Sequence, residues 1–85
     1  MNYQKNHSTL FDTFLKYLNS WFDEWVFEYD SDTISSVILK GHNESGTLYL
    51  NYEIADEVIT SPNLWDVQVE DLEEKVKEYE KKQNS

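Results

Sequence analysis

The chain has 85 residues, no cysteine and no arginine, and its 17 carboxylates against seven lysines give a formal net charge of −10. A chain of this length forms one domain with one small hydrophobic core, and the missing cysteines exclude disulfides and thiolate metal sites. The negative charge excludes direct binding to nucleic acid or anionic membranes and favours a basic partner. Because 15% of the residues are aromatic, we expect residues 1–85 to fold as a single domain around an aromatic core.

Nothing in the sequence predicts export or membrane insertion. No segment approaches the roughly 20 apolar residues that a membrane span requires. The N-terminal residues lack the basic start and apolar run of a signal peptide. We therefore expect a soluble cytoplasmic protein.

The first predicted element is an amphipathic helix over residues 8–25. Its apolar residues recur at three- and four-residue spacings, as Leu10, Phe11, Phe14, Leu15, Leu18, Trp21, Phe22 and Trp25. Ser8 and Thr9 are alternative caps for its N-terminus, since either hydroxyl can accept a hydrogen bond from a free backbone N–H.

Three strands are predicted next. From Trp25 the apolar period changes to two, which is typical of a strand over residues 25–30. A second strand is expected over 34–41, where β-branched and aliphatic residues dominate, and a third over 47–54, which alternates between apolar and polar side chains. The turn sequences "SDT" and "NESG" separate them, so the pattern predicts an antiparallel meander.

The segment between this meander and the C-terminal residues has two interpretations. Ser61 and Pro62 can open a helical turn, or residues 65–69 can form a short fourth strand, which the alternation of Trp65, Val67 and Val69 favours. Residues 70–83 are predicted to be helical, with acids in the first turn and lysines in the last. The expected fold is α+β: an antiparallel sheet of three or four strands flanked by an N-terminal and a C-terminal helix.

The residue inventory does not match known catalytic or metal-binding patterns. His7 and His42 are the only histidines, and neither a G-x-S-x-G nor an H-E-x-x-H motif is present. The calcium-loop pattern that begins at Asp30 has Ile34 where a ligand is needed and Ser35 where glycine is needed. We therefore expect no enzymatic activity, no catalytic residues, no metal and no cofactor.

The acidic residues are distributed unevenly. The stretch "WFDEWVFEYDSD" holds five aromatic residues, five carboxylates and no cation, and between Trp21 and Glu74 fourteen carboxylates accompany only Lys40. We interpret the aromatic side chains as core. A surface that served only solubility would interleave both signs, so the one-sided charge predicts a binding role.

Strand geometry suggests where this charge gathers. Alternate residues of a strand lie about 6.6 Å apart, so Glu28, Asp30 and Asp32 are predicted to form a linear row of anions. Carboxylates on the neighbouring turns are expected to widen the row into a patch. The candidate partner-binding residues are Asp23, Glu24, Glu28, Asp30, Asp32, Glu44, Glu53, Asp56 and Glu57.

The acidic meander "EWVFEYDSDTISSVILKGHNESGTLYLNYEIADE", with its flanking helices, resembles small DNA-mimicking inhibitors that phages encode, especially anti-CRISPR proteins that act on Cas9-type nucleases. The resemblance rests on size, acidity, lack of arginine and order of elements. It implies a non-enzymatic inhibitor, monomeric or homodimeric, that blocks the basic nucleic-acid-binding groove of a nuclease or another DNA or RNA enzyme in the host bacterial cytoplasm.

An alternative function is also open. The chain is also compatible with a protein-interaction module, such as an antitoxin or adaptor, that binds its partner through an aromatic patch or the C-terminal helix. A small enzyme that uses clustered carboxylates is a further rival, and it requires a pocket that holds a perturbed acid.

Overall fold

The computed structural model describes residues 9–83, so Ser8 and His7 lie outside the described residues. Along the chain the elements are α1 (Thr9–Ser20), β1 (Trp25–Asp32), β2 (Ser36–Asn43), β3 (Tyr49–Ala55), α2 (Asp56–Ile59), the 3-10 turn η2 (Pro62–Leu64) and α3 (Trp65–Gln83). The strands form one antiparallel sheet in the order β1-β2-β3. The predicted α+β fold is confirmed, with three strands rather than four.

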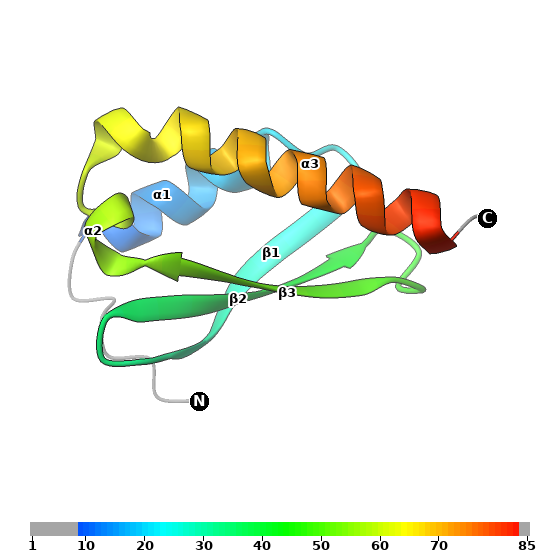
Figure 1. Ribbon diagram of the computed structural model, residues 1–85, viewed down its shortest axis with the longest axis horizontal. Helices are drawn as coiled ribbons and strands as arrows, with labels where there is room; N and C mark the ends of the chain where they lie inside the picture. The colour runs from blue at the N-terminus through cyan, green and yellow to red at the C-terminus, as the bar shows by residue number, and fades with distance from the viewer. Residues whose placement is uncertain (1–8, 84–85) are drawn as a thin grey trace.

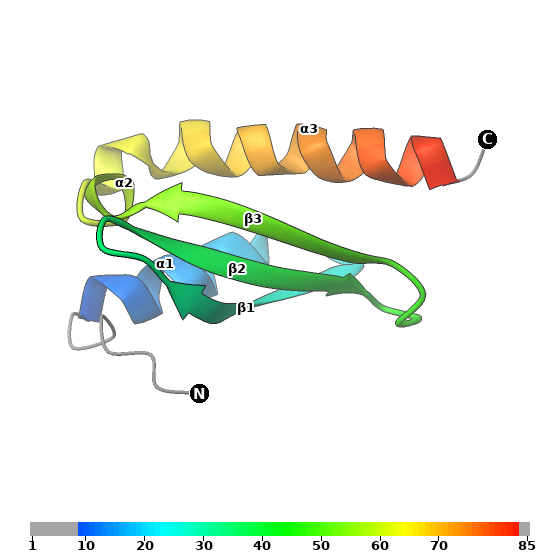
Figure 2. The ribbon, with the colours of Figure 1, turned by 60° about the horizontal axis from the view of Figure 1, so that its bottom comes forward.

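Both long helices cover the same face of the sheet (Figure 1). Figure 2 shows α3 along the side of β3, while α1 lies behind the strands. Side chains that alternate along the strands point toward these helices and are buried, among them Phe27, Leu39 and Tyr52. On the opposite face, Val26 and Tyr49 are 50% and 60% exposed, and no described element covers them. The core therefore lies between one face of the sheet and the two helices.

The helix predicted over residues 8–25 ends earlier, at Ser20. The side chain of Asn19, in its last turn, forms hydrogen bonds with the sheet. The Asn19 amide oxygen accepts a hydrogen bond from the Phe27 backbone N–H at 2.8 Å, and its amide nitrogen donates to the Phe27 carbonyl at 3.0 Å. Asn19 thus occupies the outer edge of β1, where an unpaired strand otherwise exposes its backbone groups.

We expect Asn19→Ala to lower the free energy of unfolding by about 1–3 kcal/mol, because it leaves two half-buried backbone groups of Phe27 without partners. Urea denaturation followed by circular dichroism measures this loss. The control Asn51→Ala changes an exposed asparagine of β3 and is expected to stay within about 0.5 kcal/mol of the parent. Equal effects of both variants would contradict the edge-capping role of Asn19.

β1 contains one irregularity. Its pairing with β2 shifts by one residue between Tyr29 and Ser31, so Asp30 is an extra residue without a partner in β2. Such a bulge shifts the alternation of side chains by one position. The Asp32 side chain then lies on the face of the sheet that the helices cover, whereas Glu28 lies on the opposite, open face. The prediction that Glu28, Asp30 and Asp32 form one row is therefore wrong.

The fourth strand predicted over residues 65–69 is also wrong, because these residues form the first turns of α3. Trp65 and Val69 are buried, while Val67 between them is 67% exposed, which is a helical and not a two-residue period. Pro62 opens the preceding 3-10 turn, as the alternative interpretation proposed. The low helix propensity of valine costs about 0.5 kcal/mol, whereas burial of one such side chain contributes about 1.5–3 kcal/mol.

The aromatic side chains of the stretch near the start of β1 differ in burial. Trp25 and Phe27 are buried in the core, as predicted, and Phe22 and Tyr29 are half-buried against it. Trp21 is 36% exposed, so the expectation that it belongs to the core is wrong. It follows the last residue of α1, where the chain leaves the helix and turns toward the sheet. Part of its indole ring is therefore at the surface.

Candidate functional site

Helix α3 contains more charged residues than any other element of the described structure. It has 19 residues, of which seven are carboxylates and four are lysines. The carboxylates are Asp66, Glu70, Asp71, Glu73, Glu74, Glu78 and Glu80, and the lysines are Lys75, Lys77, Lys81 and Lys82. The contacts of these groups decide which charges remain exposed at the surface.

Aromatic side chains from the rest of the molecule bind three of these carboxylates. The Tyr17 hydroxyl donates to Asp66 Oδ1, the Tyr52 hydroxyl to Asp71 Oδ2 at 2.5 Å, and the Trp25 indole N–H to Glu80 Oε2 at 2.8 Å. Buried aromatic side chains with a polar tip usually find such partners. Through these hydrogen bonds, the three carboxylates hold α3 in place over the sheet and α1.

The two tyrosines remain protonated donors well above neutral pH. The hydrogen bond to Asp66 raises the pKa of Tyr17 above its ordinary value of 10.0. Burial raises the pKa of Tyr52, and the hydrogen bond and negative charge of Asp71 raise it further. Both hydroxyl groups therefore carry the proton that they donate to α3 at physiological pH.

Two of the lysines form ion pairs within the helix. Lys75 Nζ lies 3.9 Å from Asp71 Oδ2, and Lys77 Nζ lies 3.8 Å from Glu73 Oε2. Both pairs are spaced i,i+4 with the acid on the N-terminal side, which is the favourable orientation in a helix. They leave the other carboxylates of α3 without a lysine partner among the described ion pairs.

The remaining carboxylates form a row. Glu70, Glu74 and Glu78 are exposed, and no hydrogen bond or ion pair engages them within residues 9–83. Because they are four residues apart, each step rises about 6 Å along one side of the helix. Asp66 continues the same spacing toward the N-terminus of α3. We call Asp66, Glu70, Glu74 and Glu78 the acidic row.

The open face of the sheet, by contrast, is electrostatically mixed. Glu28 faces Lys40 across the β1–β2 pair, so a cation lies beside this carboxylate. Glu53 Oε2 accepts a hydrogen bond from the Ser36 hydroxyl at 2.5 Å. The exposed apolar side chain of Val26 lies on the same face. This face therefore does not carry the continuous anionic surface that the sequence predicted.

The other predicted residues lie near opposite ends of the sheet. The Glu44 backbone N–H donates to the Glu24 carbonyl at 2.7 Å, so these two residues lie side by side. Asp23 precedes Glu24 in the chain and lies at the same end. At the far end, the Asp56 backbone N–H donates to the Ser35 carbonyl at 2.9 Å. The remaining residues at this far end are Asp30, Asp32 and Glu57. The structure separates the nine candidates instead of joining them in one patch.

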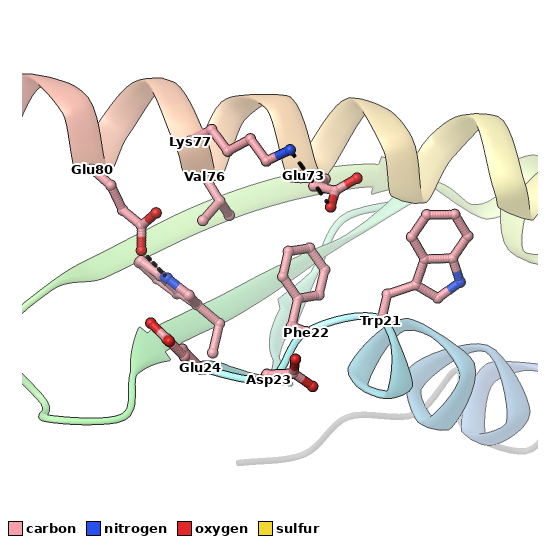
Figure 3. Close-up of a pocket in the computed structure, with 9 residues that line it drawn as sticks. Trp21, Phe22, Asp23, Glu24, Glu73, Val76, Lys77 and Glu80 are labelled. Carbon is pink, nitrogen blue, oxygen red and sulfur yellow. Dashed lines mark hydrogen bonds and ion pairs between the residues drawn. The ribbon is translucent and has the colours of Figure 1, made fainter.

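Asp23 and Glu24 join α3 around a surface hollow of about 310 Å³. One wall is the segment from Trp21 to Trp25, which links α1 to β1. Glu73, Val76, Lys77 and Glu80 of α3 form the opposite wall. Figure 3 shows the rings of Trp21 and Phe22 pointing toward α3, with Lys77 directed at Glu73 along α3. The structure thus brings two predicted residues together with carboxylates that the prediction omitted.

The acidic row was missed although its signal is present in the sequence. Carboxylates at positions 66, 70, 74 and 78 repeat every four residues, which is the helical signature of a shared side. The assignment of residues 65–69 to a strand hid the first step of this repeat. The tertiary contacts of Tyr17, Tyr52 and Trp25 were required to separate its three glutamates from Asp66, Asp71 and Glu80, which accept hydrogen bonds.

Two general properties complete the description of residues 9–83. No group of three or more histidine, aspartate or glutamate side chains is arranged to hold a metal ion there. In the same part of the chain, no helix has both the length and the apolar character of a membrane span.

No protein-family model matches the chain, and no curated protein and no solved structure matches it significantly.

Proposed function

We propose that the protein is a non-enzymatic inhibitor that binds the basic nucleic-acid-binding groove of a host enzyme and competes with the nucleic acid. A Cas9-type nuclease is the first partner class to test, because of the resemblance in size, charge and order of elements. The proposed contact surface is the exposed side of α3 together with Asp23 and Glu24, instead of the sheet.

The observation that carries this proposal is the acidic row. Its three glutamates form no ion pair among the described residues, although Lys77 and Lys81 line one surface hollow together with Glu74 and Glu78. The row advances by about 6 Å per carboxylate, and every second phosphate of one B-DNA strand advances by about 6.8 Å along the axis. A groove lined with lysine and arginine for nucleic acid therefore attracts this helix by the same electrostatics.

The alternative use of α3 as a pairing helix finds less support. The apolar stripe that such pairing requires consists of Val69, Leu72 and Val76, and all three are buried against the sheet and α1. An interaction through α3 must therefore use its charged side. This favours a basic partner over a coiled-coil or helix-pairing partner.

A competition experiment tests the proposal. A purified guide-loaded Cas9-type nuclease, a restriction enzyme, a uracil-removing enzyme and RNA polymerase are each titrated with labelled DNA at several fixed concentrations of the protein. Fluorescence anisotropy reports DNA binding. For the target enzyme, we expect the apparent Kd for DNA to rise in proportion to protein concentration, and the inhibition to weaken steeply between 50 and 300 mM salt (about the range over which charge screening grows).

Two results would contradict the proposed function. One is a ternary complex of enzyme, DNA and protein, which means that the protein does not occupy the groove. The other is binding that does not change with salt, since an apolar interface behaves in that way. A pull-down from bacterial lysate at low and high salt extends the search to enzymes outside the panel.

A further inference from the structure

The hollow between α3 and the segment that follows α1 has an unusual lining. Trp25 and Trp65 are buried, whereas Trp21 is 36% exposed and contributes its indole ring to the hollow. Trp21 packs edge-on against Tyr17, with ring centroids 6.1 Å apart, and Phe22 packs against Phe27 at 5.1 Å. These contacts hold both rings at the surface. The hollow therefore has preformed aromatic walls.

Negative charge surrounds these aromatic rings. Four carboxylates line the hollow, and Lys77 is the only cation among its lining residues. No described hydrogen bond or ion pair engages the side chains of Asp23 and Glu24 within residues 9–83. Glu73 is held only by an exposed ion pair of 3.8 Å with Lys77, and such pairs are weak. The hollow thus combines accessible ring faces with uncompensated carboxylates.

We propose that this hollow is a binding site for an arginine side chain of the partner. This inference rests on the proposed function for the source of the arginine. A cation over an indole or phenyl face is attracted by the ring quadrupole, and the planar guanidinium also forms forked hydrogen bonds with carboxylates. A volume of about 310 Å³ corresponds to roughly ten water molecules, which is enough space for one long side chain. Trp21 and Phe22 provide the ring faces, and Asp23, Glu24 and Glu73 provide the acceptors.

Lys77 acts as an internal competitor in this arrangement. Its ammonium group pairs with Glu73 at the edge of the hollow, so an incoming guanidinium must displace it or bind beside a like charge. Removal of the Lys77 charge therefore strengthens arginine binding. A purely structural role of the hollow does not predict this gain.

The experiment uses N-acetyl-arginine-N-methylamide as the probe and the matching citrulline derivative, which is neutral and nearly the same shape, as its control. Both are titrated into the full ¹⁵N-labelled chain, and the indole N–H signal of Trp21 is followed by NMR. We expect a saturable shift of this signal with the arginine probe and none with citrulline. Trp21→Leu, followed through the Phe22 and Asp23 amides, weakens the affinity by about 2- to 30-fold, the range measured for cation–π contacts.

Two variants complete the test. Lys77→Gln is expected to tighten arginine binding by about 2- to 5-fold, because an exposed like charge typically opposes binding by this amount. Tyr49→Leu alters an exposed aromatic side chain on the open sheet face and leaves the affinity unchanged. A citrulline response equal to that of arginine, or an equal loss of affinity in Tyr49→Leu and Trp21→Leu, would overturn the assignment.

This result is independent of the competition experiment, because the small probe needs no partner enzyme. If arginine binds the hollow but no enzyme of the panel is inhibited, the site stands and the proposed target class fails. If an enzyme is inhibited but the arginine probe does not shift the Trp21 signal, the inhibitor stands and the arginine site is overturned.

Discussion

The triple variant Glu70→Gln, Glu74→Gln and Glu78→Gln is expected to bind its target enzyme about 3- to 100-fold more weakly at low salt, if each exposed charge contributes the usual 0.2–1 kcal/mol. Asp66 is left unchanged because Tyr17 donates a hydrogen bond to it. We also expect the affinity to fall less steeply with salt concentration, since fewer charges contact the proposed basic groove. Isothermal titration calorimetry at several salt concentrations measures both effects.

The fold of this variant is expected to be at least as stable as that of the parent. Glutamine and glutamate have similar helix propensities, and the change removes like-charge neighbours four residues apart. The matched control, Glu28→Gln with Asp30→Asn and Glu53→Gln, removes the same number of charges from β1 and β3. If this control loses as much affinity as the α3 variant, only the net charge matters and the acidic row is not the contact surface.

Gly41→Ala is expected to lower the free energy of unfolding by about 1–3 kcal/mol, the usual cost of overpacking a core. Gly41 lies opposite Phe27 in the sheet, and a Cβ atom built at Gly41 overlaps the Phe27 ring. The ring cannot move aside freely, because it is buried against Phe22 and stacks on Trp25 at 5.9 Å. A domain of this size has only about 0.05–0.15 kcal/mol of stability per residue, so a substantial fraction is lost.

Double-mutant analysis by urea denaturation identifies the cause. We expect Gly41→Ala combined with Phe27→Leu to be less destabilised than the sum of the two single variants, because the smaller side chain relieves the overlap. Gly46→Ala serves as control. Gly46 has a φ of 74°, so alanine there costs about 1 kcal/mol through backbone strain and should add to Phe27→Leu without coupling. Strict additivity at Gly41 would show that steric overlap is not the cause.

The combination of acidic and aromatic residues now has a structural explanation. Aromatic hydroxyl and indole groups of Tyr17, Tyr52 and Trp25 use carboxylates of α3 as hydrogen-bond acceptors. Three of the carboxylates therefore hold α3 over the core as hydrogen-bond acceptors. The glutamates of the acidic row have no such role among the described contacts, so they are the charges that we propose to contact a partner.

The sequence alone determined the order and class of α1, the three strands and the C-terminal part of α3. The change from a three- to four-residue period to a two-residue period marks the passage from α1 to β1, and "NESG" marks the β2–β3 turn. These signals are local, because backbone geometry sets the period at which side chains return to the same face. The composition likewise sets the net charge of −10, from which we expect a basic partner.

Only the tertiary structure decided where the charges lie. The bulge at Asp30 depends on the register between two strands, and the helical state of residues 65–69 depends on burial of Trp65 and Val69, which outweighs the strand preference of valine. Which carboxylates remain free for a partner depends on hydrogen bonds between residues up to 55 positions apart, as between Trp25 and Glu80. Such contacts form when distant segments pack together, so a local period cannot reveal them.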